Sequence, residues 1–241
     1  MHGSLRDREI ILAGGSGGLG QAIAELLASE GARLVVSYRS NAQRAGRLRH
    51  IATQVLAADL AVAADRTRLL EAAPSLYGLV VLAGEPARVA DPGEFETVLR
   101  RSLEVNLVGP VALAREAAER MKAAGTPGAI VLFSTMQAIG LFPGSLAYAA
   151  PKAGLLHAAR VLAKEFRGPA NVRVNVVCPG VIQAGMAEAS IAAGKYDRYL
   201  AERVIPRFGR ASDVARAVRF FLEPDNYITG QCLLVDGGLT L

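Results

Sequence analysis

Short apolar segments alternate with amphipathic helical patterns along the whole chain, and this alternation restricts the folds open to the sequence. The apolar segments are continuous, which is typical of strands buried on both faces of a parallel sheet. Such strand–helix–strand units connect parallel strands through right-handed crossovers. The expected strands are Ile10–Ala13, Arg33–Tyr38, Thr53–Ala57, Leu76–Ala83, Ala129–Ser134, Val172–Val177 and Cys232–Val235. We predict an α/β fold, a doubly wound parallel sheet of about seven strands with helices on both faces.

The predicted helices fill the intervals between these strands, and no linker or low-complexity segment interrupts the pattern. They are Leu19–Ser29, Asn41–Arg49, Ala64–Ala73, Pro92–Leu99, Leu103–Ala124, Ala147–Phe166, Tyr196–Arg203 and Ser212–Leu222. The chain has 241 residues, which one large domain can accommodate. We therefore expect a single domain over residues 1–241.

The composition excludes several other classes of protein. Apolar residues make up 51% of the chain and charged residues 20%, enough for a sizeable core. No apolar run approaches the roughly 18 residues of a membrane span, and residues 1–8 lack the apolar core of a signal peptide. We expect a soluble, cytoplasmic protein with no membrane partner. The net charge is +5, but the arginines are scattered, which favours an anionic cofactor or substrate over nucleic acid.

Neither the cysteines nor the histidines form a metal-binding motif. Cys178 and Cys232 lie in apolar segments, so we expect buried free thiols in preference to a disulfide or a metal pair. The three histidines, His2, His50 and His157, have no metal-ligand spacing, and we expect no metal site.

A glycine-rich turn, Gly14 to Gly20, separates the first predicted strand from the first predicted helix. Glycines let the backbone turn tightly, and a helix N-terminus offers unpaired N–H groups to a pyrophosphate. By itself such a turn has either a structural or a phosphate-binding role. The second strand ends in Tyr38-Arg39-Ser40, with no acidic residue for an adenosine 2′-hydroxyl. An arginine beside hydroxyl groups suits a 2′-phosphate better, although Arg39 can also be an exposed loop residue.

The ends of the third and fourth predicted strands carry further candidates. Asp59 follows the third strand, where its carboxylate can accept from an adenine amino group or cap the next helix. Ala83 and Gly84 follow the fourth strand, where small residues let a ligand lie against the strand end. Asn106 lies early in a long predicted helix, and asparagine there can cap, kink or hold a water.

A second group of polar residues follows the fifth predicted strand. Ser134 and Thr135 end that strand, and Tyr148 and Lys152 are four residues apart, which places them on one face of a helix. Proline is tolerated in the first turn of a helix, so Pro151 predicts a helix that begins at Tyr148 or one residue before it. Tyr148 then stands at the mouth of the helix, beside the strand ends.

Together these segments resemble the short-chain dehydrogenase/reductase family over essentially the full length of the chain. The matching residues are Gly14, Gly18 and Gly20 of the family's Gly-x-x-x-Gly-x-Gly turn, Asp59, Ala83-Gly84, Asn106, Ser134-Thr135, Tyr148-x-x-x-Lys152, Pro179-Gly180 and Val235-Asp236-Gly237-Gly238. Two segments, Asn175–Gly180 and Tyr227–Gln231, look most like the 3-oxoacyl-(acyl carrier protein) reductases. The resemblance implies a Rossmann-like fold and a homotetramer.

The resemblance also implies roles for the matched residues. Tyr148 would exchange a proton with a ketone or alcohol as hydride moves, and Lys152 would hold the nicotinamide ribose. Lys152 and the cationic ring of an oxidised nicotinamide would together lower the pKa of Tyr148. A hydroxyl of Ser134 or Thr135 would bind the carbonyl oxygen, and Asn106 would anchor a water that links Lys152 to solvent. The residues expected to bind the cofactor are Gly14, Ser16, Gly17, Gly18, Leu19, Gly20, Tyr38, Arg39, Ser40, Asp59, Leu60, Ala83, Gly84, Tyr148, Lys152, Pro179, Gly180 and Ile182.

Several positions depart from the family pattern. The family serine lies thirteen residues before the tyrosine, and Thr135 occupies that position here, with Ser134 beside it. Val81 and Leu82 stand where the family has paired asparagines. The other departures, each the loss of a polar or charged side chain, are Ala13, Gly17 and Ala184. None of them removes the proton-transfer residues.

The sequence thus predicts NADPH-dependent reduction of a ketone to an alcohol, with NADP(H) favoured over NAD(H). The carbonyl compound is expected to be a 3-oxoacyl thioester or a related small molecule. Gln183–Phe208 is the expected substrate lid, and the candidate pocket walls are Met136, Gln137, Phe142 and Met186. The altered positions also motivate an alternative, a nucleotide-binding module with lost or residual turnover that acts through partners.

Overall fold

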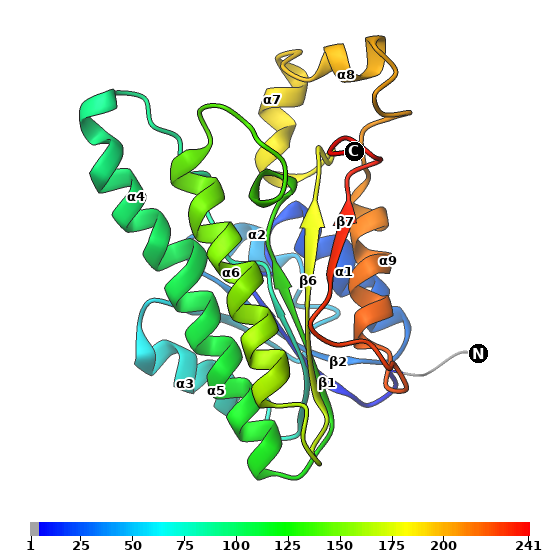
Figure 1. The fold of residues 1–241 in the computed structure, drawn as a ribbon. Coiled ribbons are helices and arrows are strands. Elements are labelled where there is room, and N and C mark those ends of the chain that lie inside the picture. The colour runs from blue at the N-terminus through cyan, green and yellow to red at the C-terminus, as the bar shows by residue number, and fades with distance from the viewer. Residues whose placement is uncertain (1–4) are drawn as a thin grey trace.

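A computed structural model of the chain describes residues 5–241 (Figure 1). Within these residues seven strands form one sheet, and every neighbouring pair is parallel. The strands are β1 (Glu9–Ala13), β2 (Arg33–Tyr38), β3 (Gln54–Ala57), β4 (Leu76–Val81), β5 (Gly128–Phe133), β6 (Val172–Pro179) and β7 (Cys232–Val235). Their order, β3-β2-β1-β4-β5-β6-β7, confirms the predicted doubly wound fold.

Helices cover both faces of the sheet (Figure 1). The α-helices are α1 (Gly18–Ser29), α2 (Ala42–Gly46), α3 (Ala63–Glu71), α4 (Phe95–Leu103), α5 (Gly109–Ala123), α6 (Leu146–Glu165), α7 (Glu188–Ala192), α8 (Asp197–Ala201) and α9 (Ala211–Leu222). The shorter helical segments are the 3-10 turns η1 (Pro92–Glu94), η3 (Met136–Ala138) and η4 (Gly185–Ala187), and the π-helical segment η2 (Glu104–Val108).

Each face of the sheet has its own apolar core, because alternate residues of a strand point to opposite faces. Ile10 and Leu12 of β1 are fully buried in the cluster that includes α1 and α9. Ile11 and Ala13 of the same strand are buried in the cluster formed with α5 and α6. This two-sided burial is the physical reason that the strands are continuous apolar runs in the sequence.

The order of the strands reverses at β1, which pairs with β2 on one side and with β4 on the other. Gly14 follows β1 and has a φ of 76°. A Cβ at Gly14 would lie 2.8 Å from the Cα of Ala83, the second residue after β4. No side chain fits there, so the ends of β1 and β4 meet closely at the reversal, where folds of this type bind ligands.

The long helix predicted over Leu103–Ala124 is divided by the π-helical segment η2, which contains Asn106. Pro110, at the start of α5, has no N–H to donate to the carbonyl four residues earlier, which is that of Asn106. The regular hydrogen-bond ladder is therefore interrupted at this point. Pro151 lies in the second turn of α6, deeper than predicted, because the helix begins at Leu146.

The prediction of two buried thiols is wrong for one of them. Cys178 in β6 is buried, whereas Cys232 is exposed because it begins the edge strand β7, and both thiols are free. Of the N-terminal segment 1–8, residues 1–4, which include His2, lie outside the described residues. No helix between residues 5 and 241 is both long and apolar enough to cross a membrane. In the same range, no three His, Cys, Asp or Glu residues gather as metal ligands.

Candidate active site

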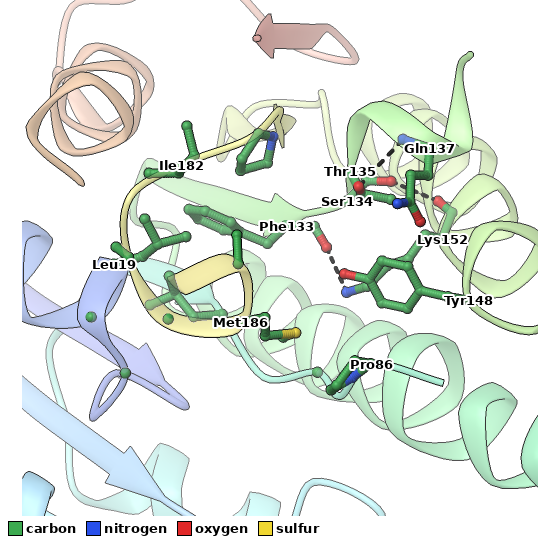
Figure 2. A pocket seen from close by; sticks show the side chains of 18 of the residues that line it. Leu19, Pro86, Phe133, Ser134, Thr135, Gln137, Tyr148, Lys152, Ile182 and Met186 are labelled. Atoms are coloured by element: carbon green, nitrogen blue, oxygen red, sulfur yellow. Dashed lines mark hydrogen bonds between the residues drawn. The ribbon is translucent and has the colours of Figure 1, made fainter. Parts of the chain in front are cut away.

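A cleft of about 820 Å³ lies at the carboxyl ends of the strands, a volume typical of ligand sites in proteins. The connections after β1 to β4 form one part of its wall. The ends of β5 and β6, the first turns of α6 and the segment after β6 form the other part (Figure 2). The cleft therefore spans the point at which the strand order reverses.

The N-terminus of α1 faces this cleft and has no side-chain cap. The first hydrogen bond of the helix runs from the Gln21 N–H to the Gly17 carbonyl (2.9 Å), so the N–H groups of residues 18–20 have no partner within the helix. A Cβ at Gly20 would collide with the carbonyl oxygen of Gly15, so the helix packs directly on the turn. These unpaired N–H groups and the absence of side chains fit a pyrophosphate.

Two arginines from the connection after β2 and from α2 also line the cleft. Arg39 follows β2, and Arg44 lies in α2, whose N-cap Asn41 accepts a hydrogen bond from the Arg44 N–H (2.8 Å). Ser40 lines the cleft as predicted, whereas Tyr38 does not, because it is still paired with β3 as the last residue of β2. Sequence reasoning missed Arg44, although an asparagine three residues before it is a recognisable N-cap signal.

Arg39 is held in place by a carboxylate from another strand end. Its Nη2 lies 3.3 Å from Oε2 of Glu85, and Arg101 of α4 lies 2.7 Å from the same carboxylate. Arg39 and Arg101 carry two positive charges and Glu85 one negative charge, so the trio keeps a net positive charge. The Glu85 carboxylate can therefore orient Arg39 without cancelling its attraction for an anion. Asp59 also lines the cleft, and its Oδ1 accepts from the Ala61 N–H (3.0 Å), as a local cap does.

The inner end of the cleft contains four of the five predicted catalytic residues, Ser134, Thr135, Tyr148 and Lys152 (Figure 2). Lys152 is buried, and its Nζ donates to the Phe133 carbonyl at the end of β5 (2.8 Å). The Ser134 hydroxyl donates to the backbone carbonyl of Lys152 (2.9 Å). The Thr135 hydroxyl oxygen accepts from the Gln137 N–H at the start of η3 (3.3 Å).

The two hydroxyls are distinguished by where their protons go. A backbone carbonyl can only accept, so the proton of Ser134 is committed to the carbonyl of Lys152. A backbone N–H can only donate, so the hydroxyl oxygen of Thr135 accepts and its proton is free. Thr135 is therefore the hydroxyl that can donate to a ligand in the cleft.

Desolvation governs the acid–base properties of the catalytic pair. It raises the pKa of Tyr148 to about 12 and lowers the pKa of Lys152 to about 8. In the protein alone, burial outweighs any effect of Lys152 on the pKa of Tyr148. The expected lowering of this pKa by Lys152 together with an oxidised nicotinamide stays a prediction for the cofactor complex. Tyr148 is thus a protonated acid at neutral pH.

Asn106 is fully buried and does not line the cleft. Its Oδ1 accepts from the Glu85 N–H (3.1 Å), and its Nδ2 donates to the Glu85 carbonyl (3.1 Å) and the Ser102 hydroxyl (2.9 Å). A Cβ at Gly84 would lie 2.8 Å from Asn106 Oδ1 and 3.2 Å from Lys152 Nζ. Asn106 therefore fixes the strand-end segment that lies against Lys152, in a π-helical turn of the kind often found at functional sites.

The segment Gln183–Phe208 lies over the ends of β6 and β7, where Figure 1 shows α7 and α8. Ile205 and Phe208 of this segment pack with Met136 and Val181 in a small apolar cluster. Tyr196 and Tyr199 stack with ring centroids 6.3 Å apart, and both line the cleft. The four predicted pocket walls all line the cleft as well: Met136, Gln137, Phe142 and Met186.

The structure brings all but two of the predicted site residues to the cleft, the exceptions being Tyr38 and Asn106. Those that line it are Gly14, Ser16, Gly17, Gly18, Leu19, Gly20, Arg39, Ser40, Asp59, Leu60, Ala83, Gly84, Ser134, Thr135, Tyr148, Lys152, Pro179, Gly180 and Ile182. Polar lining residues missed by sequence reasoning are Asn41, Arg44, Ser145, Arg88, Lys195 and Arg198. The last three belong to no motif, and only their place in the fold reveals them.

Known proteins resemble this chain over its full length. The family model described as Enoyl-(Acyl carrier protein) reductase matches residues 13–240. The chain is similar to 3beta-hydroxysteroid dehydrogenase 1 of Eggerthella lenta, with 32% identity over 254 residues, 100% of this chain and 97% of the relative. It is similar to carbonyl reductase family member 4 of Danio rerio, with 35% identity over 97% of this chain and 98% of the relative.

A solved structure shows the same arrangement in three dimensions. The structure of a short-chain type dehydrogenase/reductase from Mycobacterium ulcerans matches with a TM-score of 0.88 and 25% identity, covering 100% of this chain and 91% of that one. The full-length structural match agrees with the parallel sheet covered by helices. The chain therefore belongs to the short-chain dehydrogenase/reductase family of oxidoreductases.

Proposed function

We propose that this protein reduces a ketone to an alcohol with NADPH, and that Tyr148 is the proton donor. The observation that carries the proposal is the pairing of two proton donors at the inner end of the cleft. Tyr148 is protonated at neutral pH, and Thr135 has a free hydroxyl proton. A carbonyl oxygen that gains negative charge would be stabilised by the hydroxyl of Thr135 and protonated by Tyr148.

The cofactor fits the remainder of the cleft. The bare N-terminus of α1 would hold the pyrophosphate, and Arg39 with Arg44 would hold an adenosine 2′-phosphate. When bound, the nicotinamide supplies the hydride for the carbonyl carbon. Arg39 and Arg44 line this part of the cleft together with one carboxylate, that of Asp59. The positive charge of the two arginines exceeds the negative charge of Asp59, which favours NADPH over NADH.

The proton would pass in two steps, from Tyr148 to the substrate and then from Lys152 to Tyr148. Tyr148 gives its proton to the substrate oxygen and is left as a phenolate. Lys152 reaches the same end of the cleft and has the lower pKa, about 8 against about 12. Its ammonium is therefore the stronger acid and restores the proton of Tyr148, while Ser134 holds the backbone of Lys152 in place.

The charge of the substrate end points to an anionic carbonyl compound. Arg88, Lys195 and Arg198 line the cleft, and within residues 5–241 none of them forms an ion pair with a carboxylate. Lys195 lies 5.7 Å from the Tyr196 ring centroid, which keeps this cation at the cleft. We infer a 3-oxoacyl thioester whose carrier bears phosphate groups.

Turnover is tested by following NADPH absorbance with a panel of ketones and 3-oxoacyl thioesters. Wild-type protein should oxidise NADPH, and Tyr148→Phe should abolish turnover while NADPH binding, measured by fluorescence, is retained. A protein that binds NADPH but turns over no carbonyl compound would instead be the nucleotide-binding module that acts through partners. Arg39→Ala should weaken NADPH far more than NADH, and equal weakening of both would contradict the 2′-phosphate assignment.

The substrate charge is tested with one acyl group on two carriers. We compare a 3-oxoacyl coenzyme A thioester with the uncharged N-acetylcysteamine thioester. Lys195→Gln should raise KM for the coenzyme A thioester by roughly two- to fivefold and leave the neutral thioester unchanged. The matched control is Arg203→Gln, which removes the same charge from the same segment at a residue that does not line the cleft. Equal effects of both variants would contradict a specific phosphate contact.

Assembly, lid motion and location complete the proposal. The family resemblance supports a homotetramer, which light scattering of the purified protein would detect as four times the chain mass. The segment 183–208 is proposed to open and close as a lid over the cleft, and hydrogen exchange with and without NADPH measures that motion. The composition supports a cytoplasmic location, which cell fractionation tests.

A further inference from the structure

Two thiols from neighbouring strands meet at the edge of the sheet. Cys178 lies near the end of β6 and Cys232 begins β7, the parallel strand beside it. Their sulfur atoms are 3.1 Å apart, although 54 residues separate them in the sequence. Cys178 is fully buried, whereas Cys232 is exposed, so one member of this thiol pair is open to reagents in solution.

The buried member lies directly behind the proposed catalytic hydroxyls. The Cys178 thiol interacts with the Ser134 side chain and with the backbone of Thr135. The backbone links the same two segments, because the Ser134 N–H donates to the carbonyl of Val177, the residue before Cys178 (3.0 Å). Any covalent change at Cys178 would therefore act on the residues that hold the reacting oxygen, without any group entering the cleft.

The two thiols differ in how readily they ionise. The two sulfurs share a hydrogen bond in which either can donate. This contact lowers the pKa of Cys232, whereas the same contact and burial raise the pKa of Cys178. Peroxide attacks a thiolate in preference to a thiol. The exposed Cys232 is thus the thiol that reacts first, and Cys178 is in contact with it as the second partner.

We propose that the thiol pair is a peroxide-sensitive modification site that closes as an intrachain disulfide behind the catalytic hydroxyls. Hydrogen peroxide transfers one oxygen to the Cys232 thiolate, which gives a sulfenic acid and hydroxide. The Cys178 thiol then attacks the sulfenic sulfur, forming the S–S bond and releasing water. Two thiols are oxidised and one peroxide is reduced, and a small-molecule dithiol reverses the reaction.

Closure would disturb the reaction that we propose, and this consequence rests on the proposed function. The sulfurs must approach by roughly 1 Å to reach bonding distance, which draws Cys178 away from Ser134 and Thr135. Misplacement of reacting groups by such a distance lowers catalytic rates steeply. We expect oxidised protein to turn over roughly tenfold more slowly, with recovery on reduction.

The test begins with fully reduced protein that is treated with hydrogen peroxide, quenched by alkylation and digested without reductant. Mass spectrometry should find one peptide pair joined through Cys178 and Cys232, with the loss of two hydrogens. Cys232→Ser should have wild-type turnover before treatment, form no cross-link and keep its turnover in peroxide. Cys178→Ala should instead accumulate sulfinic acid at Cys232.

Three results would overturn the proposal. The first is the absence of the cross-link, and the second is a cross-link between Cys232 residues of two chains. The third is an intrachain cross-link that leaves turnover unchanged, which removes the link to the catalytic strand. Because the cross-link is detected by mass, its presence or absence is established even for a protein with no measurable reductase activity.

Discussion

Replacing Thr135 by valine separates catalysis from stability. Valine keeps the branched shape but removes the free hydroxyl proton, which is the donor that we assign to the carbonyl oxygen. Loss of one such donor costs about 10²- to 10³-fold in kcat, or roughly 3–4 kcal/mol of transition-state stabilisation. The same substitution also removes the 3.3 Å bond from the Gln137 N–H, a long neutral contact that is worth about 1 kcal/mol or less of folding stability.

The assay pairs NADPH consumption at saturating ketone with thermal unfolding of the same samples. Thr135→Val should lose most of its turnover while Tm falls by only about 2–4 °C. Thr135→Ser keeps the hydroxyl and should retain most of the turnover. The Ser134 hydroxyl already donates its proton to the Lys152 carbonyl and has none left for the substrate. Ser134→Ala removes only this bond and should lower kcat by less than about tenfold. The reasoning is refuted if Ser134→Ala is the inactive variant and Thr135→Val is active.

Three further predictions follow from individual contacts. Gly84→Ala places a methyl group 2.8 Å from Asn106 Oδ1 and 3.2 Å from Lys152 Nζ, so we expect turnover to fall by more than about tenfold without unfolding, and an active variant would contradict this packing. Lys152 has a pKa lowered from 10.5 to about 8, so it is charged below that pH and neutral above it. The kcat/KM for NADPH should therefore fall above pH 8. A profile that is flat to pH 10 would exclude a charged Lys152 as the group that binds the cofactor and restores the proton of Tyr148. Arg173 is buried and donates to the carbonyls of Phe221 (2.8 Å) and Glu223 (2.8 Å) at the end of α9. Arg173→Met leaves these two carbonyls without a donor and should lower the free energy of unfolding by roughly 3 kcal/mol, measured by urea denaturation.

The fold could be predicted because its determinants are local in the chain. Each strand is buried on both faces and is therefore a continuous apolar run, and each helix shows its own periodicity. The glycines of the turn after β1 mark a place where no side chain fits, and the structure places that turn against Ala83. Tyr148 and Lys152 were found because a helix fixes the relation of residues four apart.

The predictions that failed depend on neighbours that are distant in the chain. The edge position of β7 exposes Cys232, and a strand's place in the sheet cannot be read from its own residues. Tyr38 was expected to bind the cofactor, but its backbone stays paired with β3 and its side chain does not line the cleft. The burial that raises the pKa of Tyr148 in the protein alone also comes from packing between elements, and the segment around Tyr148 carries no signal of it.

The sequence by itself determined the doubly wound sheet, the position of the cleft and the residues to which we assign its chemistry. Only the tertiary structure decided which hydroxyl has a free proton, because Ser134 finds its acceptor 18 residues away in α6 while Thr135 is satisfied two residues away. It also decided that Asn106 braces Glu85 behind the cleft and that two thiols touch. Periodicity encodes which face a residue occupies, whereas hydrogen-bond partners are chosen only when separate elements pack together.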